Sequence, residues 1–501
     1  MPPREARIVA LCFGVLGLVI AGLILFAPMR DVVLRFVHDD AFYYFGVARG
    51  WRRYGFPTFD GIDATNGYHP LWQWLLVAVP GARADPAAFA RAGAASGVLF
   101  FGVGTWLIAR RLGREANPFG ALAYAWVAGT LLLATIYGME SPLAALLLAV
   151  AIFAAPHHLD DWTLSRALAC GAATSLLFLA RLDALPWLVA LDGVLVAIAL
   201  GSRRRQIFAL VGLIGAVQLA VVAGYFLSNR LIWGHLLSIS AALKAARAPL
   251  FSLAVPRSLL FLLAIGVAGL GLVPLTEFLR ALRHGRSDRA SELATPAWLA
   301  LANLAYLAAI AAKGDRETYN WYFTLTVFSG AYLLPVCLEH YGVVWTGLSR
   351  RTLARWTLGA CLVFLVISAR SKMTSPSFFV GAYDKALTLA SFPENSLVLA
   401  ATDCGILGYF SRQRVINLDG LTNSWDFQQA LADDRVAGWL TDRGVNAYVA
   451  PPAVEDGVAL LITRAGLSST PRTLRLHVEP IRPVSPASGD IAVWRVTAIE
   501  Q

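Results

Sequence analysis

The sequence predicts a mainly α-helical polytopic membrane protein, followed by an α/β domain at the C-terminal end. Of its 501 residues, 57% are hydrophobic and only 15% are charged, whereas a soluble protein carries about 25% charged residues. Apolar runs recur along the chain, and several are long enough to cross a ~30 Å hydrocarbon core at about 1.5 Å per residue. These runs stop near residue 370, where shorter amphipathic segments take their place.

The apolar runs define eleven expected membrane spans. The first is too long for a secretory signal peptide and lacks a small-residue cleavage site, so we expect it to be retained. A further run at 70–79 is only about ten residues long, so we expect a short helix at the membrane interface instead of a span. The expected spans are 8–28, 88–109, 119–137, 141–155, 165–180, 184–200, 206–228, 257–279, 295–312, 321–338 and 355–369.

The positions of the arginines predict the orientation of the spans. Cytoplasmic loops carry an excess of Lys and Arg, and the arginine clusters here follow alternate spans. A cytoplasmic N-terminus puts every cluster on the cytoplasmic side, and it puts the loop at 30–87 and the tail from residue 371 outside. The clusters are Arg4 and Arg7; Arg110, Arg111 and Arg114; Arg203, Arg204 and Arg205; Arg280, Arg283, Arg286 and Arg289; and Arg350, Arg351 and Arg355.

Composition argues against two other classes of protein. The net charge is +10, but the basic residues lie between apolar runs, as helix orientation requires, so we expect no nucleic-acid binding. The five cysteines show no paired spacing, which argues against a disulfide framework and a zinc site. They are Cys12, Cys170, Cys337, Cys361 and Cys404.

The tail is predicted to be a separate α/β domain. An amphipathic helix is expected at 427–443. With about 130 residues the tail is large enough for its own core. We therefore expect a transmembrane module at 1–370 and an extracytoplasmic α/β domain at 371–501. Strand character is found at 396–401, 414–418, 445–450, 473–478 and 491–496.

The outside loop at 30–87 carries the residues best suited to chemistry. Asp39 and Asp40 are adjacent carboxylates just beyond a span, where ionised groups cost free energy unless they are paired, metal-bound or functional. Aromatic residues and arginines, among them Arg52 and Arg53, are interspersed in the segment that follows. This composition suits an interfacial helix or an anionic lipid headgroup. Taken alone, the acidic pair is equally explained as the start of a helix, where a carboxylate contributes about 0.3–1 kcal/mol.

Short motifs spread over most of the chain carry a resemblance to a known class of enzymes. They are Asp39-Asp40-Ala41-Phe42-Tyr43, Phe59-Asp60-Gly61, Thr65-Asn66-Gly67-Tyr68-His69-Pro70-Leu71-Trp72, Tyr137-Gly138-Met139-Glu140-Ser141-Pro142-Leu143, Arg181-Leu182-Asp183, Gly234 to Lys244, Gly405-Ile406-Leu407-Gly408-Tyr409-Phe410 and Asp419-Gly420-Leu421. The set resembles the GT-C glycosyltransferases, among them protein O-mannosyltransferases and lipid A aminoarabinose transferases. The tail motifs resemble the mycobacterial terminal arabinofuranosyltransferase and its bacterial relatives.

The resemblance implies an inverting glycosyltransferase of the cell envelope, in a bacterial inner (plasma) membrane. Such enzymes take sugar from a polyprenyl-phosphate donor outside the cytoplasm, and the acceptor here is a hydroxyl of a glycan, a lipid or a protein. The resemblance places the general base on the acidic pair, Asp40 or Asp39. Adjacent carboxylates raise one another's pKa, which suits a base near neutral pH. A positioned base contributes about 10²–10⁴-fold to the rate.

The leaving phosphate needs fixed cations, and the candidates are Lys244, Arg181, Arg52 and Arg53. Lys244 and Arg181 are equally explained as interfacial anchors. In oligosaccharyltransferases of the same class an acidic loop residue helps to bind a divalent metal. By that resemblance Glu140, with Asp39, is a candidate ligand for Mg²⁺ or Mn²⁺. The expected substrate pocket contains Asn66, Tyr68, His69, Trp72, His235 and Asp183.

Two other functions share part of the pattern. A polymerase or ligase of surface polysaccharide would use cations on the same face, but it would not require the acidic pair. A transporter of lipid-linked sugar would place ionisable residues near the membrane midplane and show internal repeats. Here the ionisable residues lie at the outer ends of the expected spans, and no repeat is visible, so a glycosyltransferase is favoured.

Overall fold

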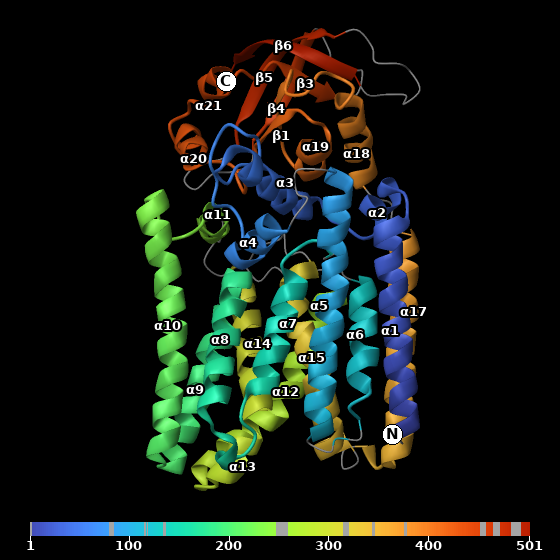
Figure 1. Ribbon diagram of the computed structural model, residues 1–501, viewed down its shortest axis with the longest axis vertical. Coiled ribbons are helices and arrows are strands. Elements are labelled where there is room, and N and C mark those ends of the chain that lie inside the picture. The colour runs from blue at the N-terminus through green and yellow to red at the C-terminus, as the bar shows by residue number, and fades with distance from the viewer. Residues whose placement is uncertain are drawn as a thin grey trace. The chain divides into compact units, whose positions relative to one another are not determined.

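The computed structural model forms two compact units, which Figure 1 labels by element. The helical unit consists of Met1–Ile24, Ala95–Leu227 and Pro249–Ser375. The sheet unit consists of Leu25–Ala94, Ser228–Ala248 and Pro376–Gln501, so the first loop, at 30–87, folds together with the tail. The sequence-based division at residue 370 stays a prediction. The structure describes residues 3–79, 85–114, 117, 119–133, 137–246, 259–313, 320–342, 346–374, 378–450, 457–463, 471–481 and 492–500.

The helical unit is a bundle whose central helix is α15, which packs against α6, α7, α12 and α14. Nearly every residue of α15 is buried. The elements are α1 Pro3–Phe26, α5 Pro86–Arg114, α6 Leu122–Leu133, α7 Ser141–Ala154, η1 Leu159–Asp161, α8 Leu164–Ala180, η2 Leu182–Ala184, α9 Leu185–Ser202, α10 Arg205–Trp233, α12 Leu259–Arg283, α13 Ser287–Glu292, α14 Ala294–Lys313, η3 Asn320–Phe323, α15 Thr324–Cys337, η4 Leu338–Gly342 and α17 Arg350–Thr374.

Each of the eleven expected spans is occupied by a helix. Among the described residues, seven helices are long and apolar enough to cross a membrane, and α7 and α8 are shorter apolar helices. The count of eleven crossings stays a prediction. Residues 134–136 and 257–258, at the edges of two expected spans, lie outside the described residues.

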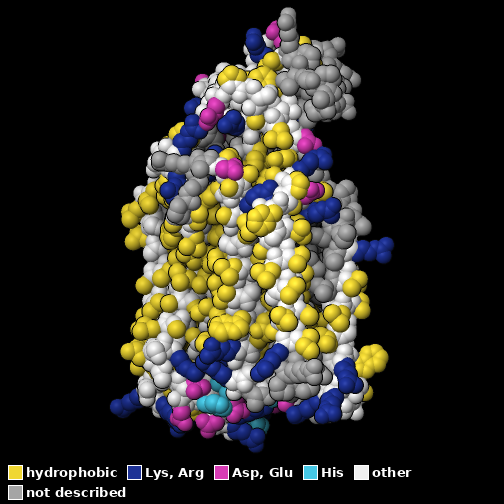
Figure 2. Space-filling view, turned by 45° about the vertical axis from the view of Figure 1, so that its right-hand side comes forward, with side chains coloured by type: hydrophobic (Ala, Val, Ile, Leu, Met, Phe, Trp, Pro, Cys, Tyr) yellow, Lys and Arg dark blue, Asp and Glu magenta, His cyan; other side chains and the backbone are white. Residues whose placement is uncertain are grey.

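The surface of the helical unit suits lipid. Large apolar side chains such as Leu18, Leu219 and Trp356 are more than two-thirds exposed, and Figure 2 shows a broad hydrophobic face. A soluble protein rarely exposes such a continuous apolar patch. The protein is therefore a multi-pass membrane protein.

The arginine-rich connections lie at one end of the helical unit. Figure 1 places the ends of α5, α9 and α12 and the beginnings of α10 and α17 at the same, lower end of the bundle, and Figure 2 shows Lys and Arg side chains gathered there. The arginines between α9 and α10 and those after α12 are mostly exposed. The arrangement agrees with the charge pattern from which the orientation is predicted.

The residues at the ends of α3 and α4 explain where these two short helices of the sheet unit begin and end. The helix α3 follows His38, whose ring accepts a hydrogen bond from the Asp40 N–H, and it ends at Gly55, where φ is +84°. The helix α4 begins at Pro70, which suits a first helical position because it has no N–H to leave unbonded. The helices are α2 Met29–Arg35, α3 Asp39–Tyr54, α4 Pro70–Ala78, α11 Ile239–Ala246, α18 Phe378–Leu389, α19 Gly405–Phe410, α20 Trp425–Ala432 and α21 Val436–Asp442.

The described part of the tail contains a mixed six-stranded sheet with the order β2-β1-β3-β6-β5-β4. The strand β1 pairs in parallel with β2 and β3, and the other pairs are antiparallel. Apolar residues of α20 and α21 pack on the sheet, with Phe427 and Leu440 completely buried. The strands are β1 Val398–Ala401, β2 Arg414–Asn417, β3 Ala447–Ala450, β4 Val458–Ile462, β5 Thr473–Pro480 and β6 Ala492–Glu500.

The predicted fold class is confirmed, and the structure corrects the tail in detail. The five predicted strands correspond to β1, β2, β3, β5 and β6, while β4 was not predicted. Residue 491, the first of one predicted strand, lies outside the described residues. The single helix expected at 427–443 is two helices, because Asp434 has a φ of +58° and the chain turns there. The nine-residue α4 confirms the short helix expected at 70–79.

Candidate active site

The acidic pair at the beginning of α3 divides into a bound carboxylate and a partly exposed one. Asp39 is only 2% exposed. Its carboxylate accepts hydrogen bonds from the N–H groups of Gly405 and Ile406, at 2.9 and 2.7 Å. The side chain of Asp40 is 33% exposed and lies 3.9 Å from the ring of His38. Asp39 therefore joins the first loop to α19, and Asp40 faces solvent.

Burial controls the protonation of Asp39. Loss of water raises its pKa to about 7, and the neighbouring charges of Asp40 and Asp403 act in the same direction. The two N–H donors on Ile406 and Gly405 oppose this rise, because they favour the ionised form.

One turn further along α3, Tyr43 enters a second buried network. Its hydroxyl donates to the Asp419 carboxylate at 3.0 Å and accepts from the Cys404 N–H and the Asn417 amide, each at 2.9 Å. Asp419 also accepts from the Asp403 N–H at 2.8 Å. The first loop is thus tied by hydrogen bonds to the beginning of α19 and to Asn417 and Asp419 at the end of β2.

The segment around Asn66 meets the tail and α11 in the same unit. The Asn66 amide donates to Asn229 at 2.9 Å and accepts from the Ile239 N–H at 3.0 Å. A Cβ atom on Gly67 would overlap the carbonyl oxygen of Leu421. Only glycine permits this approach, which brings the Asn-Gly-Tyr-His segment against the Asp-Gly-Leu turn of the tail.

Two further predicted residues lie in the connection between α10 and α11 and in α11 itself. The ring of His235 stacks on Trp425, with centroids 3.5 Å apart and an interplanar angle of 11°. Partial burial and then the charge of Arg230 lower the pKa of His235, so its ring is neutral near pH 7. Lys244 lies in the last turn of α11 and is partly exposed.

In the helical unit, Arg181 is the centre of a buried ionic cluster. The side chain is only 2% exposed and donates to both carboxylate oxygens of Asp183, at 3.0 and 2.7 Å. It also donates to the Ser141 hydroxyl at 2.7 Å and the Trp321 carbonyl at 2.9 Å, and it lies 3.3 Å from Glu140. Arg181 and Asp183 therefore form an ion pair, and every nitrogen of the guanidinium donates a hydrogen bond.

Comparison with known proteins gives the fold. ArnT from Cupriavidus metallidurans bound to undecaprenyl phosphate is similar, with a TM-score of 0.52 and 16% identity, over 96% of this chain and 97% of that one. Its apo state gives a TM-score of 0.53 and 15% identity, over 97% and 98% of the two chains. The apo oligosaccharyltransferase of Archaeoglobus fulgidus gives 0.51 and 15%, over 90% and 70%. The chain has the GT-C fold.

The GT-C fold covers both units, because the similarity to ArnT extends over nearly the whole length of both chains. A family model described as a domain of unknown function (DUF8728) matches residues 381–490, within the tail. No curated protein sequence matches this chain significantly.

The remaining predicted residues of the GT-C site all lie in the sheet unit. Arg52 donates to the carbonyls of Val77 and Val79 at the end of α4, and Arg53 pairs with Glu394. Trp72 is buried in α4. Tyr68 lies beside Trp51, with ring centroids 6.2 Å apart, and His69 immediately precedes α4. The sheet unit thus unites ten predicted residues, Asp39, Asp40, Arg52, Arg53, Asn66, Tyr68, His69, Trp72, His235 and Lys244, while Glu140, Arg181 and Asp183 cluster in the helical unit.

The two candidate ligands of a divalent cation each have protein partners in this structure. Glu140 is paired with Arg181, and both oxygens of Asp39 accept N–H bonds. Within the described ranges no group of three or more His, Cys, Asp or Glu residues could hold a metal ion. We therefore derive no reaction step through a metal.

Sequence reasoning assigned no role to Tyr43, Asn417 or Asp419. Tyr43 and Asp419 both belong to motifs that carry the resemblance to GT-C enzymes. The available signal for their contact was the presence of both motifs, far apart in the sequence. Neither hydrophobic periodicity nor spacing reveals a contact across more than 370 positions.

Proposed function

We propose that this protein is a membrane glycosyltransferase that moves a sugar from a polyprenyl-phosphate donor to a hydroxyl acceptor, with inversion at the anomeric carbon. The observation that carries the proposal is the position of Asp40. Its carboxylate is partly exposed at the point where the first-loop and tail motifs meet, while the neighbouring Asp39 is bound to α19. The GT-C fold supports the donor class, since the ArnT structure holds undecaprenyl phosphate.

Asp40 acts as the general base in this proposal. It accepts the proton of the acceptor hydroxyl while the hydroxyl oxygen bonds to the anomeric carbon. The bond between that carbon and the phosphate oxygen breaks, and the polyprenyl phosphate leaves with the electron pair. Attack from the side opposite the leaving group inverts the configuration. A base in this position contributes about 10²–10⁴-fold to the rate.

Lys244 is the proposed partner of the leaving phosphate. It lies on α11, whose first residue, Ile239, donates its N–H to Asn66. The Asn-Gly-Tyr-His segment of the first loop therefore holds the beginning of α11 in place. A fixed cation stabilises the negative charge that develops on the leaving phosphate. Arg181 has a different proposed role. Because its donors are already used by Asp183, Ser141 and Trp321, it organises the outer ends of helices in its own unit.

The proposed location is a bacterial inner membrane, with a cytoplasmic N-terminus and the sheet unit outside the cytoplasm. The arginine-rich end of the helical unit supports this orientation. Reporter fusions test it: alkaline phosphatase fused after residue 500 should be active, and the same reporter in the arginine loop at 203–205 should be inactive. Activity with the opposite pattern would invert the orientation.

Turnover of a radiolabelled polyprenyl-phosphate sugar in proteoliposomes tests the catalytic assignment. Asp40→Asn should lower kcat about 10²–10⁴-fold with little change in stability. Asp426→Asn is the matched control, because it also removes a carboxylate from the first turn of a helix in the sheet unit. Equal turnover by Asp40→Asn and the wild type would remove Asp40 from the mechanism.

Native mass spectrometry of the detergent-purified protein tests the donor site. A polyprenyl phosphate or its sugar ester should co-purify with the wild type and be depleted in Lys244→Ala. Lys385→Ala on α18 is the control, since Lys385 is also a partly exposed lysine of the sheet unit. A pyrophosphate-linked oligosaccharide in place of the monophosphate would favour a polysaccharide polymerase or ligase.

A further inference from the structure

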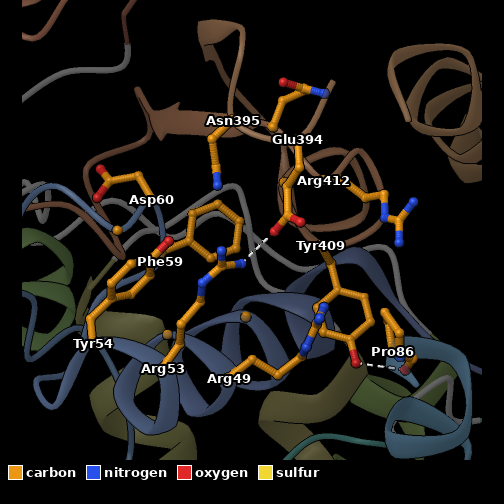
Figure 3. A pocket seen from close by; sticks show the side chains of 15 residues that line it. Arg49, Arg53, Tyr54, Phe59, Asp60, Pro86, Glu394, Asn395, Tyr409 and Arg412 are labelled. Carbon is orange, nitrogen blue, oxygen red and sulfur yellow. Dashed lines mark hydrogen bonds and ion pairs between the residues drawn. The ribbon is translucent and has the colours of Figure 1, made fainter. Parts of the chain in front are cut away.

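The sheet unit contains a cavity lined by the second half of α3, whereas the acidic pair stands in the first turn of that helix. The cavity has a volume of about 420 Å³, within the range of about 300–1,000 Å³ typical of small-molecule sites. Its other walls come from the turn at 54–61 and from tail residues at 394–395 and 408–413. Figure 3 shows the side chains directed around this space.

Three arginines and one exposed carboxylate, Glu394, line the cavity. Arg49 and Arg53 are four residues apart on α3 and so lie on one face of the helix, and Arg412 follows α19. Arg53 pairs with Glu394. Its hydrogen bond is the main cause of the lowered pKa of Glu394, and the charges of Arg412 and Arg49 add to the effect.

The other acidic residue of the cavity does not cancel this positive charge. Asp60 is almost completely buried, and its Oδ1 accepts hydrogen bonds from the N–H groups of Ile62 and Asp63. Burial raises the pKa of Asp60 to about 6. Three guanidinium groups therefore outnumber the carboxylates even when Asp60 is ionised.

Aromatic rings form the apolar walls of the cavity and are held by glycines. Phe59 fits between two of them, since a Cβ on Gly46 or Gly408 would lie 2.7 or 2.5 Å from its ring. Tyr54 rests on Gly61 in the same way. The hydroxyl of Tyr409 donates to the Pro86 carbonyl at 2.6 Å, so its ring is also fixed.

The rim of the cavity is built by hydrogen bonds. The buried Gln413 donates to the carbonyls of Leu389 and Pro393, and it accepts from the Leu397 N–H at 3.0 Å. The Asn395 N–H donates to the Arg412 carbonyl at 3.1 Å. These bonds hold the turns that carry Glu394 and Arg412 before any ligand enters.

We propose that this cavity binds an anionic saccharide, whose carboxylate or phosphate takes the place of Glu394 at the arginines. The planar guanidinium fork matches either anion in a bidentate manner. A sugar ring presents a face of C–H groups to the fixed aromatic walls and hydroxyls to Asn395 and the arginines. The inference concerns binding alone, goes beyond the proposed reaction and stands whether or not Asp40 is the base.

Calorimetric titration of the full-length protein in detergent tests the site. The probes are a disaccharide containing glucuronic acid beside its neutral amide, and glucose 6-phosphate beside glucose. At least one acidic sugar should bind about tenfold or more tightly than its neutral partner. The pair that shows this preference identifies the anion as a carboxylate or a phosphate.

Two variants are expected to change the affinity in opposite directions. A folding defect could not explain both results, because it would only weaken binding. Arg412→Asn should weaken binding of the acidic sugar about tenfold. Asn is chosen because Arg412 has a φ of +59°, which Asn tolerates. Glu394→Gln should tighten binding several-fold, because it removes the competing carboxylate. Arg475→Ala, an exposed arginine of β5, is the control. Equal affinity for acidic and neutral sugars, no loss in Arg412→Asn, or weaker binding in Glu394→Gln would each overturn the proposal.

Discussion

The Oδ1 atom of Asp39 lies 2.7 Å from the backbone nitrogen of Ile406, although the two residues are 367 positions apart in the sequence. Together with the bond from the Gly405 N–H, this contact satisfies two of the donors that every helix leaves unbonded at its N-terminus. The first of two adjacent acidic residues is thus a structural anchor, which leaves the second for chemistry.

Asp39→Asn should destabilise the start of α19. The amide of Asn accepts from one N–H group but presents its own donor to the other. A buried donor without an acceptor costs about 1–3 kcal/mol. Hydrogen exchange measured by mass spectrometry should show faster exchange of the amides at Gly405–Phe410. Asp40→Asn is the control and should leave their protection unchanged. Unaltered exchange in Asp39→Asn would show that the contact contributes nothing to stability.

The pH dependence of stability should report the buried Asp39 carboxyl. Its pKa rises from an ordinary value of 3.8 to about 7 in the folded protein, so the folded state holds the proton more tightly than the unfolded chain. Its contribution to stability is therefore complete below about pH 4 and is lost as the pH rises through about 7. Asp60 has a pKa of about 6 and titrates in the same direction, so the two effects must be separated.

A comparison of wild type with Asp39→Asn makes this separation, because Asp60 is present in both. The difference between their thermal midpoints should be largest near pH 4 and should shrink as the pH rises towards 8. A difference that stays constant over this range would mean that the Asp39 carboxyl is ionised in the folded protein throughout it.

Tyr43→Phe should weaken the link between the first loop and the tail. The change removes the donor to Asp419 and the acceptor of the Cys404 N–H. Both groups are buried, so the expected cost is about 1–3 kcal/mol, seen as a lower midpoint of thermal unfolding. Tyr448→Phe is a suitable control, since it removes a half-buried hydroxyl on β3 outside this network. Equal midpoints for the two variants would count against a structural role for the Tyr43 hydroxyl.

Gly67→Ala should displace the Asn66 segment from the tail. The added Cβ would overlap the Leu421 carbonyl, which belongs to the backbone and cannot rotate away. We expect a loss of stability of about 1–3 kcal/mol, the usual result of overpacking. Gly438→Ala in α21 has no atom within 4 Å of the new Cβ and should be neutral or stabilising by about 0.5–1 kcal/mol. Thermal unfolding of both variants measures the contrast.

The sequence predicted the helices well because lipid imposes a strong and simple pattern. A span must be long and apolar, and the arginines between spans add an independent signal, so all eleven expected positions are helical. The strand β4 was missed because it is short and its exposed residues, Leu460 and Ile462, are as apolar as its buried ones, so the sequence shows no alternation. The break at Asp434 was missed because a single left-handed residue interrupts an otherwise continuous amphipathic pattern.

The candidate site could be predicted only in part. The acidic pair was visible as charge beside a span, but its division of roles was not, because it depends on N–H groups of Gly405 and Ile406 in the tail. The cavity lined by Arg49, Arg53 and Arg412 could not be predicted from the sequence either. Arg49 and Arg53 had a visible four-residue spacing, yet Glu394 and Arg412 reach them only through the tertiary fold.

The Asp39–Gly405 contact also sets the order of events during synthesis. The 366 positions between the two residues take roughly 20–70 s to translate at about 5–20 residues per second. During that time the nascent first loop carries an unburied Asp39 and Tyr43 while the helices that follow are inserted. The loop can form these contacts only after residues 404–406 have been translated, so a transcript truncated before them would deliver an inserted bundle with an unfinished loop.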